Sequence, residues 1–524
     1  MTHCPACGTR SPQSARLLSL FDSLGPIMSG PSSSHTAGMV RIGRMGRSFI
    51  NGTPQRIVLH FFGALSHTYK GHASDSAVVA GLIGEREDSP DICRALKLAG
   101  ERGVEVIIRT HPDSDRNPNT VSMELSRDGK TYRVAGVSVG GGEIEMTELE
   151  GFPLCLRGNE DGGLFIGRDG LDRDTFESRL GPLSAFSRER GEGRTLYQCL
   201  AETPLPEENP FPELAFFPIR PILRDKLADA EPLFSTLADM ARQAGDDLPG
   251  LVERYETRRS GVTREAVREA VRLSWETMKA SIRKGLSEKN DMLAGFLPGD
   301  DGLRLARRAE AGQALSGRVL GLSVARALAV MENNGSMRRV VAAPTAGACG
   351  VLPGAFLSVT EDRGLDDDAV IDGLLVAAAV GVVVAMRAPI SGALGGCQSE
   401  IGVASAMTAA GLAQLGGGTP EQTVQAAAIA LKNLLGLICD PVAGPVEIPC
   451  IKRNAVGVSN AFAAADMALA GIASRIPPDE VVDALINVQG LLHPDLRGNL
   501  RGGLASTRTG KALKDEWYER MRGM

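Results

Sequence analysis

Aromatic residues are scarce in this 524-residue chain, at 4% of the sequence, whereas glycine is frequent, with 62 residues. We therefore expect cores that are packed mostly with small and aliphatic side chains, in which backbones approach each other closely. An excess of positive charge is also missing, because the formal net charge is −6. A nucleic-acid-binding surface needs clustered basic residues, so this balance argues against nucleic acid as a partner.

No apolar segment is long enough for a membrane span. The longest apolar run, residues 373–386, falls short of the roughly 20 residues that a spanning helix needs, and we interpret it as a buried core helix. Residues 1–16 lack the apolar stretch of a secretory signal peptide. The nine cysteines follow no regular disulfide spacing. We therefore expect no membrane association and a reducing, cytoplasmic compartment.

Several familiar site motifs are absent as well. No Walker phosphate loop occurs, and no Gly-x-Gly-x-x-Gly pattern follows a predicted strand. No lysine stands in a setting that marks a Schiff base, so we expect no pyridoxal phosphate (PLP). His493 is the only histidine after position 111, which leaves a Cys/His zinc site poorly supported. The pair Cys4 and Cys7 has zinc-knuckle spacing without a second half, and we interpret it as a terminal decoration.

The length predicts two or three domains, and local patterns divide the chain into three parts. Residues 14–150 contain both helix and strand patterns, with a helix expected at 74–83 and strands at 56–62, 104–108 and 131–134. Residues 151–262 are charged and rich in proline, which is typical of an irregular subdomain and connector. Residues 263–524 predict helices almost throughout, at 264–286, 366–386, 400–415, 421–437 and 455–475. The predicted fold class is multidomain, with an N-terminal α/β (α+β) domain and a C-terminal all-α helical domain.

The densest polar cluster lies at Ser29–Gly38, directly before a stretch with helical spacing. The free N–H groups and the dipole at a helix start favour an anion. Hydroxyl groups together with one imidazole are suited to hold a small carboxylate, and the candidates are Ser33, Ser34, His35 and Thr36. An ordinary serine N-cap in a polar loop is the alternative interpretation.

A second cluster, Lys70–Asp75, opens the next predicted helix. Gly71 permits a tight turn, and His72 is the natural general acid or base near neutral pH. Asp75 either caps the helix or orients the imidazole of His72. Structural capping alone is the competing interpretation, because a single His-x-x-Asp pattern is not specific.

Three cysteines of the C-terminal half, Cys397, Cys439 and Cys450, each lie beside a chain-bending glycine or proline. Thiolates held on such bends can converge on one soft metal centre, and a three-thiolate site leaves a cluster iron open to a substrate oxygen. Buried cysteines that act only as small hydrophobic residues are the alternative. Cys349 is either a fourth ligand or a residue packed beside the site, and we favour packing.

The segment between Cys439 and Cys450 is a Pro/Gly loop that connects two predicted helices. Arg453 follows it and supplies a guanidinium group, and Asn454 is placed to cap the second helix. Such a loop can present two thiolates, an anion-binding helix end and a guanidinium group together. Arg453 and Asn454 are therefore candidates for binding a substrate.

Together, these segments resemble the iron–sulfur-dependent bacterial L-serine dehydratases (L-serine ammonia-lyases) over most of the chain. The segments that look like the β part of that family are Ser29–Gly38, Gly71–Asp75 and Gly140–Gly142. The segments that look like its α part are 332–334, 343–350, 395–398, 439–441 and 448–455. The cysteine spacings, 42 and 11 positions (439 − 397 and 450 − 439), are similar to those of the family's three cluster ligands. Some members split the two parts into subunits, which would be fused here.

The resemblance implies a [4Fe–4S] cluster on Cys397, Cys439 and Cys450, with one iron that lacks a cysteine. It also implies conversion of the amino acid L-serine to pyruvate and ammonia, a homodimer, and an active site between the two parts. The catalytic residues that would meet the cluster there are Ser34, His35, Thr36, His72 and Asp75. Two alternatives stay open: a related lyase acting on cysteine, threonine or another β-substituted amino acid, and a non-catalytic amino-acid-binding paralogue.

Three features depart from the family pattern. Asn117 stands where the family often has histidine, in the run Asn117–Thr120. Residues 151–186 begin like a regulatory ACT domain and then degenerate, which weakens the case for feedback control by an amino acid. The printed sequence ends in Arg522–Met524, whereas some members end in a cysteine that caps the open iron.

Overall fold

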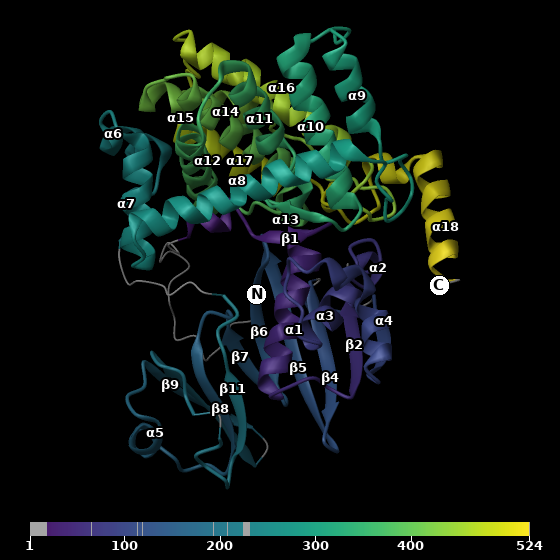
Figure 1. Cartoon of the computed structure of the whole chain (residues 1–524). Coiled ribbons are helices and arrows are strands. Elements are labelled where there is room, and N and C mark those ends of the chain that lie inside the picture. Colours follow the sequence, from purple (N-terminus) through teal and green to yellow (C-terminus); the bar gives the residue numbers. More distant parts are fainter. Residues whose placement is uncertain are drawn as a thin grey trace. The chain divides into compact units, whose positions relative to one another are not determined.

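The computed structural model describes residues 18–63, 65–112, 114–117, 119–191, 193–206, 208–223 and 231–522 (Figure 1). Cys4 and Cys7 lie outside these residues. The chain divides into two compact units, an α/β unit that holds residues 34–226 and a helical unit of residues 15–33 and 227–524. The chain passes from the helical unit to the α/β unit between Ser33 and Ser34, so its first strand belongs to the helical unit.

The α/β unit contains a six-stranded sheet in the order β3-β2-β4-β5-β6-β7. β2 and β3 are parallel, and the other neighbouring pairs of this sheet are antiparallel. The strand predicted at 56–62 is confirmed, and the one predicted at 131–134 lies inside a longer strand. The elements are α1 (Gly38–Phe49), β2 (Arg56–Phe62), α2 (Leu65–Thr68), α3 (Ser74–Leu82), α4 (Ala95–Glu101), β3 (Glu105–His111), β4 (Thr120–Arg127), β5 (Lys130–Gly140), β6 (Glu143–Leu149) and β7 (Phe152–Leu156).

The helices α1 and α3 pack against each other beside this sheet (Figure 1). Their backbones touch at two glycines: a Cβ on Gly43 would collide with the carbonyl oxygen of Val78, and a Cβ on Gly81 with that of Val40. Glycine permits this close approach because it has no side chain to separate the helices. The contact holds the start of α1 and the start of α3, where the polar clusters lie, in one rigid frame.

A second sheet of four antiparallel strands follows, in the order β11-β8-β10-β9. Its elements are β8 (Asp161–Gly167), α5 (Arg173–Leu180), β9 (Ala185–Gly191), β10 (Arg194–Ala201) and β11 (Ala215–Ile219). We expected an irregular subdomain here, and the described residues instead form regular structure. The reason is a local aromatic core, in which the rings of Phe165, Phe176, Tyr197 and Phe211 pack in tilted and edge-to-face pairs with centroid distances of 4.7–5.4 Å. Burial of these rings outweighs the charge and proline on which the expectation rested.

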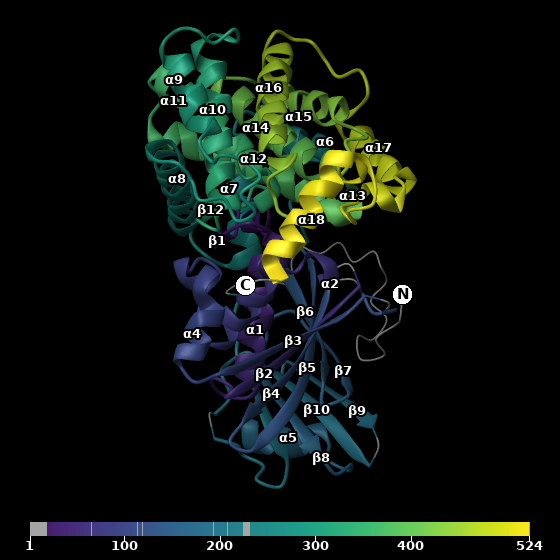
Figure 2. The same cartoon turned by 90° about the vertical axis from the view of Figure 1, so that its right-hand side faces the viewer.

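The helical unit is built around α12 (Asp367–Arg387), which packs most extensively against α14 (Val403–Leu415) (Figure 2). We expected no segment long enough for a membrane span, but among the described helices α12, with 21 residues, is long and apolar enough by length and composition. The most apolar part of this helix is, however, 78% buried inside the protein. Its central residues, from Val370 to Val384, are almost all inaccessible to solvent. This finding confirms the prediction of a buried core helix at residues 373–386.

The predicted helical character of the C-terminal part is confirmed, although several bounds differ. The first helix begins at residue 237 rather than near 263, and α16 begins at Cys450 rather than at residue 455. The other helices are α6 (Leu237–Ala244), α7 (Leu248–Ser260), α8 (Arg264–Ser287), α9 (Asp301–Glu310), α10 (Gly317–Gly335), α11 (Val351–Arg363), α13 (Gly392–Gly395), α15 (Pro420–Asn433), α16 (Cys450–Leu469), α17 (Pro478–Leu491) and α18 (Arg508–Arg522). The antiparallel pair β1 (Ile27–Ser29) and β12 (Arg339–Val341) belongs to the same unit.

Candidate functional site

The polar run after Gly30 forms a wide helical turn rather than a loop. Ser33–Ala37 make a π-helical turn that leads without a break into α1. The N-cap position of α1 is Ala37, which has no side chain that can cap, so the serines do not serve as the ordinary N-cap of this helix. The polar side chains instead stand on one extra turn of a helix whose orientation is set by its contact with α3.

Two reciprocal hydrogen bonds join this turn to the one that precedes α3. The hydroxyl of Thr36 donates to the carbonyl oxygen of His72 at 2.8 Å, and the hydroxyl of Ser74 donates to the carbonyl oxygen of His35 at 2.7 Å. Thr36 and Ser74 are fully buried. Ala73 adopts a left-handed conformation with a φ of 51°, which turns the chain into α3. The fold therefore brings together the two polar clusters that the sequence predicted separately.

The imidazoles of His35 and His72 stack, with ring centroids 4.6 Å apart and an interplanar angle of 21°. Burial lowers the pKa of His35, and burial together with the neighbouring His35 lowers the pKa of His72 well below its usual range. Both rings are therefore neutral at neutral pH. Nδ1 of His72 is buried and has no hydrogen-bond partner in the described part of the chain.

Asn119 completes this pair of histidines, although it was not among the predicted site residues. Its Nδ2 donates to the carbonyl oxygen of Ser138 at 3.4 Å, which turns its Oδ1 towards Nε2 of His35 at 3.1 Å. Oδ1 can only accept, so neutral His35 carries its proton on Nε2. The run Asn117–Thr120 was noticed in the sequence, but only the fold shows which of its asparagines reaches the imidazole.

Two predicted roles in this cluster change. Thr36 gives its only hydroxyl proton to a carbonyl, so it positions the His72 turn and cannot donate to a carboxylate at the same time. The Asp75 carboxylate accepts the backbone N–H of Ser76 at 2.9 Å, and no hydrogen bond joins it to His72 among the described residues. Burial raises the pKa of Asp75. The expected orientation of His72 by Asp75 is therefore replaced by stacking on His35.

The three predicted cysteine ligands come from separate bends of the helical unit. Cys397 follows Gly396, whose φ of +80° favours glycine, and Cys450 is the first residue of α16. Cys439 lies in the loop between α15 and α16. Its N–H donates to the carbonyl oxygen of Leu496 at 2.8 Å, and its own carbonyl oxygen accepts from the N–H of Gly498 at 2.7 Å. These backbone bonds hold the middle thiol in place from a segment far along the chain.

Two of the three thiols meet beside a carboxylate, and the third, Cys450, is only partly buried. Ligand atoms of Cys397, Cys439 and Glu400 all lie within 4.8 Å of one another. Cys450 interacts electrostatically with Cys397 and with Cys439. The hydrogen bond to Cys397, with burial, raises the pKa of Cys439, and burial followed by the charges of Cys397 and Glu400 raises the pKa of Cys450. A cation relieves such repulsion between clustered thiolates, so this donor set is consistent with a metal cofactor that prefers sulfur.

Glycines form walls around the thiol site. A Cβ on Gly392 would collide with Oε2 of Glu400 and lie 3.1 Å from Sγ of Cys439. A Cβ on Gly498 would lie 3.3 Å from the same sulfur. A side chain at either position would fill the space beside the sulfurs. Glycine thus keeps room there for a group larger than a pair of thiols, and the residues present fit a thiolate-bound metal group.

Glu400 was missed in the sequence, where it was assigned only to the start of a helix. It lies in a π-helical turn, Gln398–Gly402, directly after Cys397, which turns its carboxylate towards the sulfurs. Its Oε1 accepts from the hydroxyl of Thr345 at 2.8 Å, and burial raises its pKa. The available signal was a carboxylate about one helical turn after a candidate ligand, at a spacing that places both on one face.

Arg453 supplies positive charge beside the sulfurs. Its Nη1 donates to Sγ of Cys397 at 3.4 Å and to the carbonyl oxygen of Ile438 at 2.7 Å. Its Nη2 pairs with Oδ1 of Asp440 at 2.7 Å. Asp440 in turn accepts the N–H of Leu504 at 2.8 Å. The guanidinium group is thus engaged within the protein, where it holds the loop that carries Cys439.

Asn454 does not cap α16, as we had expected, because that helix already begins at Cys450. Its Oδ1 instead accepts the N–H of Gly350 at 3.1 Å, and its Nδ2 donates to the carbonyl oxygens of Gly347 and Cys450, each at 3.0 Å. Its donors are therefore committed within the protein. Cys349 is fully buried and lies 3.6 Å from the sulfur of Met331, in agreement with the packing role that we favoured.

The consecutive residues Glu332, Asn333 and Asn334 hydrogen-bond to other segments of the helical unit. Glu332 accepts the N–H of Asp301 at 2.6 Å, Asn333 donates to the carbonyl oxygen of Ser281 at 2.6 Å, and Asn334 donates to that of Pro31 at 2.9 Å. The end of α10 is thereby tied to α9, to α8 and to the segment after β1, all within the helical unit.

Comparison with known proteins gives matches in both parts of the chain. Residues 19–106 match the family model of the serine dehydratase beta chain, and residues 223–505 match that of the serine dehydratase alpha chain. L-serine dehydratase 2 of Escherichia coli (strain K12) is 31% identical over 513 residues, which cover 93% of this chain and 98% of that protein. L-serine dehydratase of Streptomyces coelicolor is 30% identical over 507 residues, with coverages of 93% and 98%. The probable L-serine dehydratase alpha chain of Bacillus subtilis (strain 168) is 46% identical over 256 residues, 49% of this chain and 85% of that one.

Proposed function

Because the chain belongs to the serine dehydratase family, with the beta and alpha matches in one polypeptide, we propose that it converts L-serine to pyruvate and ammonia. The observation that carries this proposal is the close approach of the thiols of Cys397 and Cys439, with Cys450 in electrostatic interaction with both. Dehydration of serine requires a better leaving group than hydroxide and a base for the Cα proton. The thiol site and the stacked histidines offer one group for each requirement.

We further propose that Cys397, Cys439 and Cys450 hold a [4Fe–4S] cluster with one iron that lacks a cysteine. Support comes from the clustered sulfurs, from the glycines that leave space beside Cys439, and from the positive charge of Arg453. When bound, such a cluster supplies a Lewis acid for the hydroxyl of serine. The chain's own contribution is to limit access of water to two of these cysteines, since Cys397 is 4% exposed and Cys439 is 9% exposed, whereas Cys450 is partly exposed.

His72 is our candidate for the base that removes the Cα proton. Its lowered pKa keeps the ring neutral, so a nitrogen lone pair is available at neutral pH. The stacked His35 restricts the ring, and Thr36 holds the backbone on which it stands. Loss of the Cα proton and of the hydroxyl group, which leaves as water, gives aminoacrylate. Its imine tautomer is hydrolysed to pyruvate and ammonia.

We propose that the substrate carboxylate is held at Ser33 and Ser34, on the extra turn before α1. The hydroxyl groups of these two residues make no hydrogen bond within the described chain, so their protons are available. The donors of Thr36 and Asn454 are already committed, and Arg453 is engaged with Cys397, Ile438 and Asp440, so we assign positioning roles to these three residues. Asp75 keeps a place in the proposed site as the buried carboxyl group of the His72 turn.

The decisive experiment is an iron and sulfide assay on protein that is purified without oxygen, combined with turnover of L-serine. We expect both elements to be present and pyruvate formation to disappear when iron is removed. The variants Cys397→Ala, Cys439→Ala and Cys450→Ala should each abolish the broad cluster absorbance, and Cys349→Ala is the matched control that should retain it. Full activity of iron-free protein would refute the proposal. Faster turnover of cysteine or threonine than of serine would reassign the substrate.

We also propose a cytoplasmic location and a homodimer. All seven cysteines of the described residues are free thiols, as a reducing compartment favours. Sedimentation of the purified protein tests the assembly, and a monomer at micromolar concentration would contradict the dimer. Export to an oxidising compartment, measured by cell fractionation, would contradict the location.

A further inference from the structure

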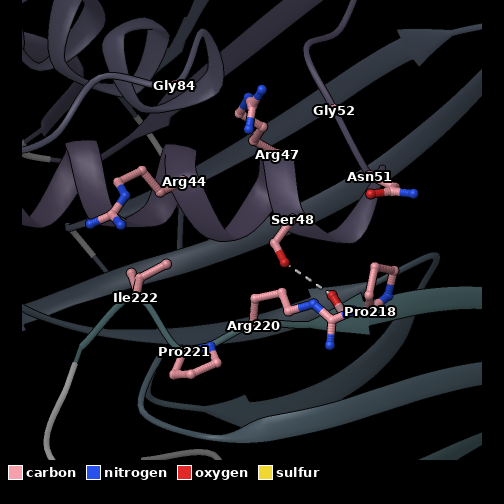
Figure 3. Close-up of a pocket in the computed structure, with 10 residues that line it drawn as sticks. All are labelled: Arg44, Arg47, Ser48, Asn51, Gly52, Gly84, Pro218, Arg220, Pro221 and Ile222. Carbon is pink, nitrogen blue, oxygen red and sulfur yellow. Dashed lines mark hydrogen bonds between the residues drawn. The ribbon is translucent and has the colours of Figure 1, made fainter. Parts of the chain in front are cut away.

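A hollow of about 400 Å³ lies inside the α/β unit, away from the turns that carry His35 and His72. The second half of α1 forms one side, and the segment that leaves β11 forms the other (Figure 3). Small-molecule sites in proteins commonly have volumes of about 300–1,000 Å³, so the hollow is large enough for a metabolite. The residues that line it are Arg44, Arg47, Ser48, Asn51, Gly52, Gly84, Pro218, Arg220, Pro221 and Ile222.

The lining carries three arginines and no acidic residue. Arg44 pairs with Glu87 at 3.3 Å, but Glu87 also pairs with Arg41 at 3.0 Å, so one carboxylate serves two guanidinium groups. Arg220 lies 3.7 Å from Asp161. Four guanidinium groups, counting Arg41, therefore face two carboxylates, which leaves a formal excess of two positive charges.

Arg47 contributes most clearly to this excess. The single hydrogen bond of its side chain within the described chain runs from Nε to the hydroxyl of Thr53, a neutral group, at 3.4 Å. No carboxylate of the described residues lies within 4 Å of its guanidinium group. The carbonyl oxygens at the C-terminal end of α1 do not offset the charge of Arg47 either. Arg127 donates to two of them, those of Ile50 and Asn51. Burial lowers the pKa of Arg44; the charge of Glu87 opposes this shift, and the charges of Arg86 and Arg41 add to it.

The shape of the hollow restricts what can fill it. Arg47, Arg44 and Arg220 come from two different elements, so an anion with several acceptor oxygens can bind more than one of them. Pro221 and Ile222 add an apolar wall, which suits a short carbon body attached to the anion (Figure 3). Ser48 donates to the carbonyl oxygen of Pro218 at 3.1 Å and so joins the two walls directly.

We propose that this hollow is a binding site for a small phosphate monoester, held by Arg44, Arg47 and Arg220 between α1 and the exit of β11. The phosphate supplies the negative charge that the lining lacks, and the carbon body lies against the apolar wall. The site is distinct from the thiol site and from the histidine pair, and it does not rest on the proposed dehydratase activity. An occupant links the six-stranded part of the unit to the four-stranded sheet, and it therefore ties α1 to β11.

Calorimetric titration of the full-length, anaerobically prepared protein with glycerol 3-phosphate tests the site, at constant ionic strength. Inorganic phosphate, malonate and glycerol serve as comparison probes. We expect one molecule of glycerol 3-phosphate per chain, weaker binding of inorganic phosphate and malonate, and none of glycerol. Arg47→Gln should weaken binding at least tenfold, because it removes the guanidinium group that has only a neutral partner.

Arg220→Gln provides a second variant from the opposite wall, and both variants are compared for folding by circular dichroism. The matched control is Arg94→Gln, which removes an exposed guanidinium group elsewhere in the same unit and should leave the affinity unchanged. Equal affinities in Arg47→Gln, Arg220→Gln and Arg94→Gln would overturn the proposal. Absence of binding by all the anionic probes would overturn it too, and tighter binding of malonate than of both phosphate probes would overturn the phosphate assignment.

Discussion

Replacement of Thr36 by valine tests whether one hydroxyl group holds the His72 turn. Valine keeps the shape of threonine and removes the proton that Thr36 donates to the carbonyl oxygen of His72 at 2.8 Å. Thr36 is 0% exposed, so water does not replace the lost donor. A buried polar group that loses its hydrogen bond costs about 1–3 kcal/mol, and this range is the expected loss of stability in the α/β unit.

The effect on catalysis should be larger than the effect on stability. His72 stands on the backbone that Thr36→Val releases, and a misplacement of roughly 1 Å at a reacting group costs on the order of 100-fold in rate. We therefore expect kcat for L-serine to fall about 10- to 100-fold with little change in KM. Ser74→Ala removes the reciprocal bond of 2.7 Å and should cost less, because Asn119 also holds His35. In the double variant, kcat should fall by less than the product of the two single decreases, because both bonds hold the same pair of turns.

The loss of stability has to be measured within the α/β unit. Both tryptophans, Trp275 and Trp517, lie in the helical unit, so their fluorescence does not report on α1. Hydrogen exchange of α1 peptides, followed by mass spectrometry, reports local opening, and a loss of about 1.4 kcal/mol speeds exchange tenfold. Ser126→Ala removes a more exposed hydrogen bond on β4 and should change neither readout.

Two results would refute this reasoning. If Thr36→Val speeds exchange in α1 but leaves kcat unchanged, the hydrogen bond is structural and His72 does not depend on it for catalysis. If exchange in α1 matches that of Ser126→Ala, the bond to the His72 carbonyl contributes nothing that can be measured, and the two turns are held by other contacts.

Three further changes test the same structure. Gly43→Ala should destabilise the α/β unit by about 1–3 kcal/mol, because its methyl group would collide with the carbonyl oxygen of Val78, and hydrogen exchange of α3 measures this loss. A pH below 6.5 should destabilise the same unit, because unfolded histidine takes up a proton near pH 6.5 whereas His72, with its lowered pKa, stays neutral in the folded state. The stability is thus complete above pH 6.5 and is lost as the pH falls, which thermal unfolding across this range detects. Arg453→Lys should speed the loss of cluster absorbance in air severalfold, because an ammonium group cannot reproduce the guanidinium fork between Cys397 and Asp440.

Each of these expectations has a control. Gly100→Ala adds a methyl group in open space, and equal stability of this variant and Gly43→Ala would contradict the contact between α1 and α3. His72→Asn should flatten the pH dependence, and an unchanged slope would assign it to other groups, of which the stacked His35 is the first candidate. Lys452→Ala removes a neighbouring exposed charge, and equal rates of cluster loss in it and in Arg453→Lys would exclude a special role for the guanidinium group.

Local patterns predicted much of the fold and failed where longer-range packing decided the structure. The strand at 56–62 and the core helix around residues 373–386 were predicted correctly, because the residues of each segment form a local hydrophobic pattern that indicates its burial. Residues 151–219 were expected to be irregular, yet Phe165, Phe176 and Phe211 meet across three elements and support a sheet. The early start of α16 was missed because a loop rich in proline and glycine obscured the first turn.

The amino-acid sequence by itself determined the chemical inventory of this protein: three cysteines on chain bends, two histidine clusters, and glycines at which backbones can touch. Tertiary structure alone decided which partners these groups have. Thr36 and Asn454 became positioning residues because hydrogen bonds within the protein commit their donors, while Asn119 reached His35 from a segment that no local pattern connects to it. The physical reason is that a hydrogen bond or a shift in pKa depends on neighbours in space, and these neighbours are brought together only when the chain has buried its core.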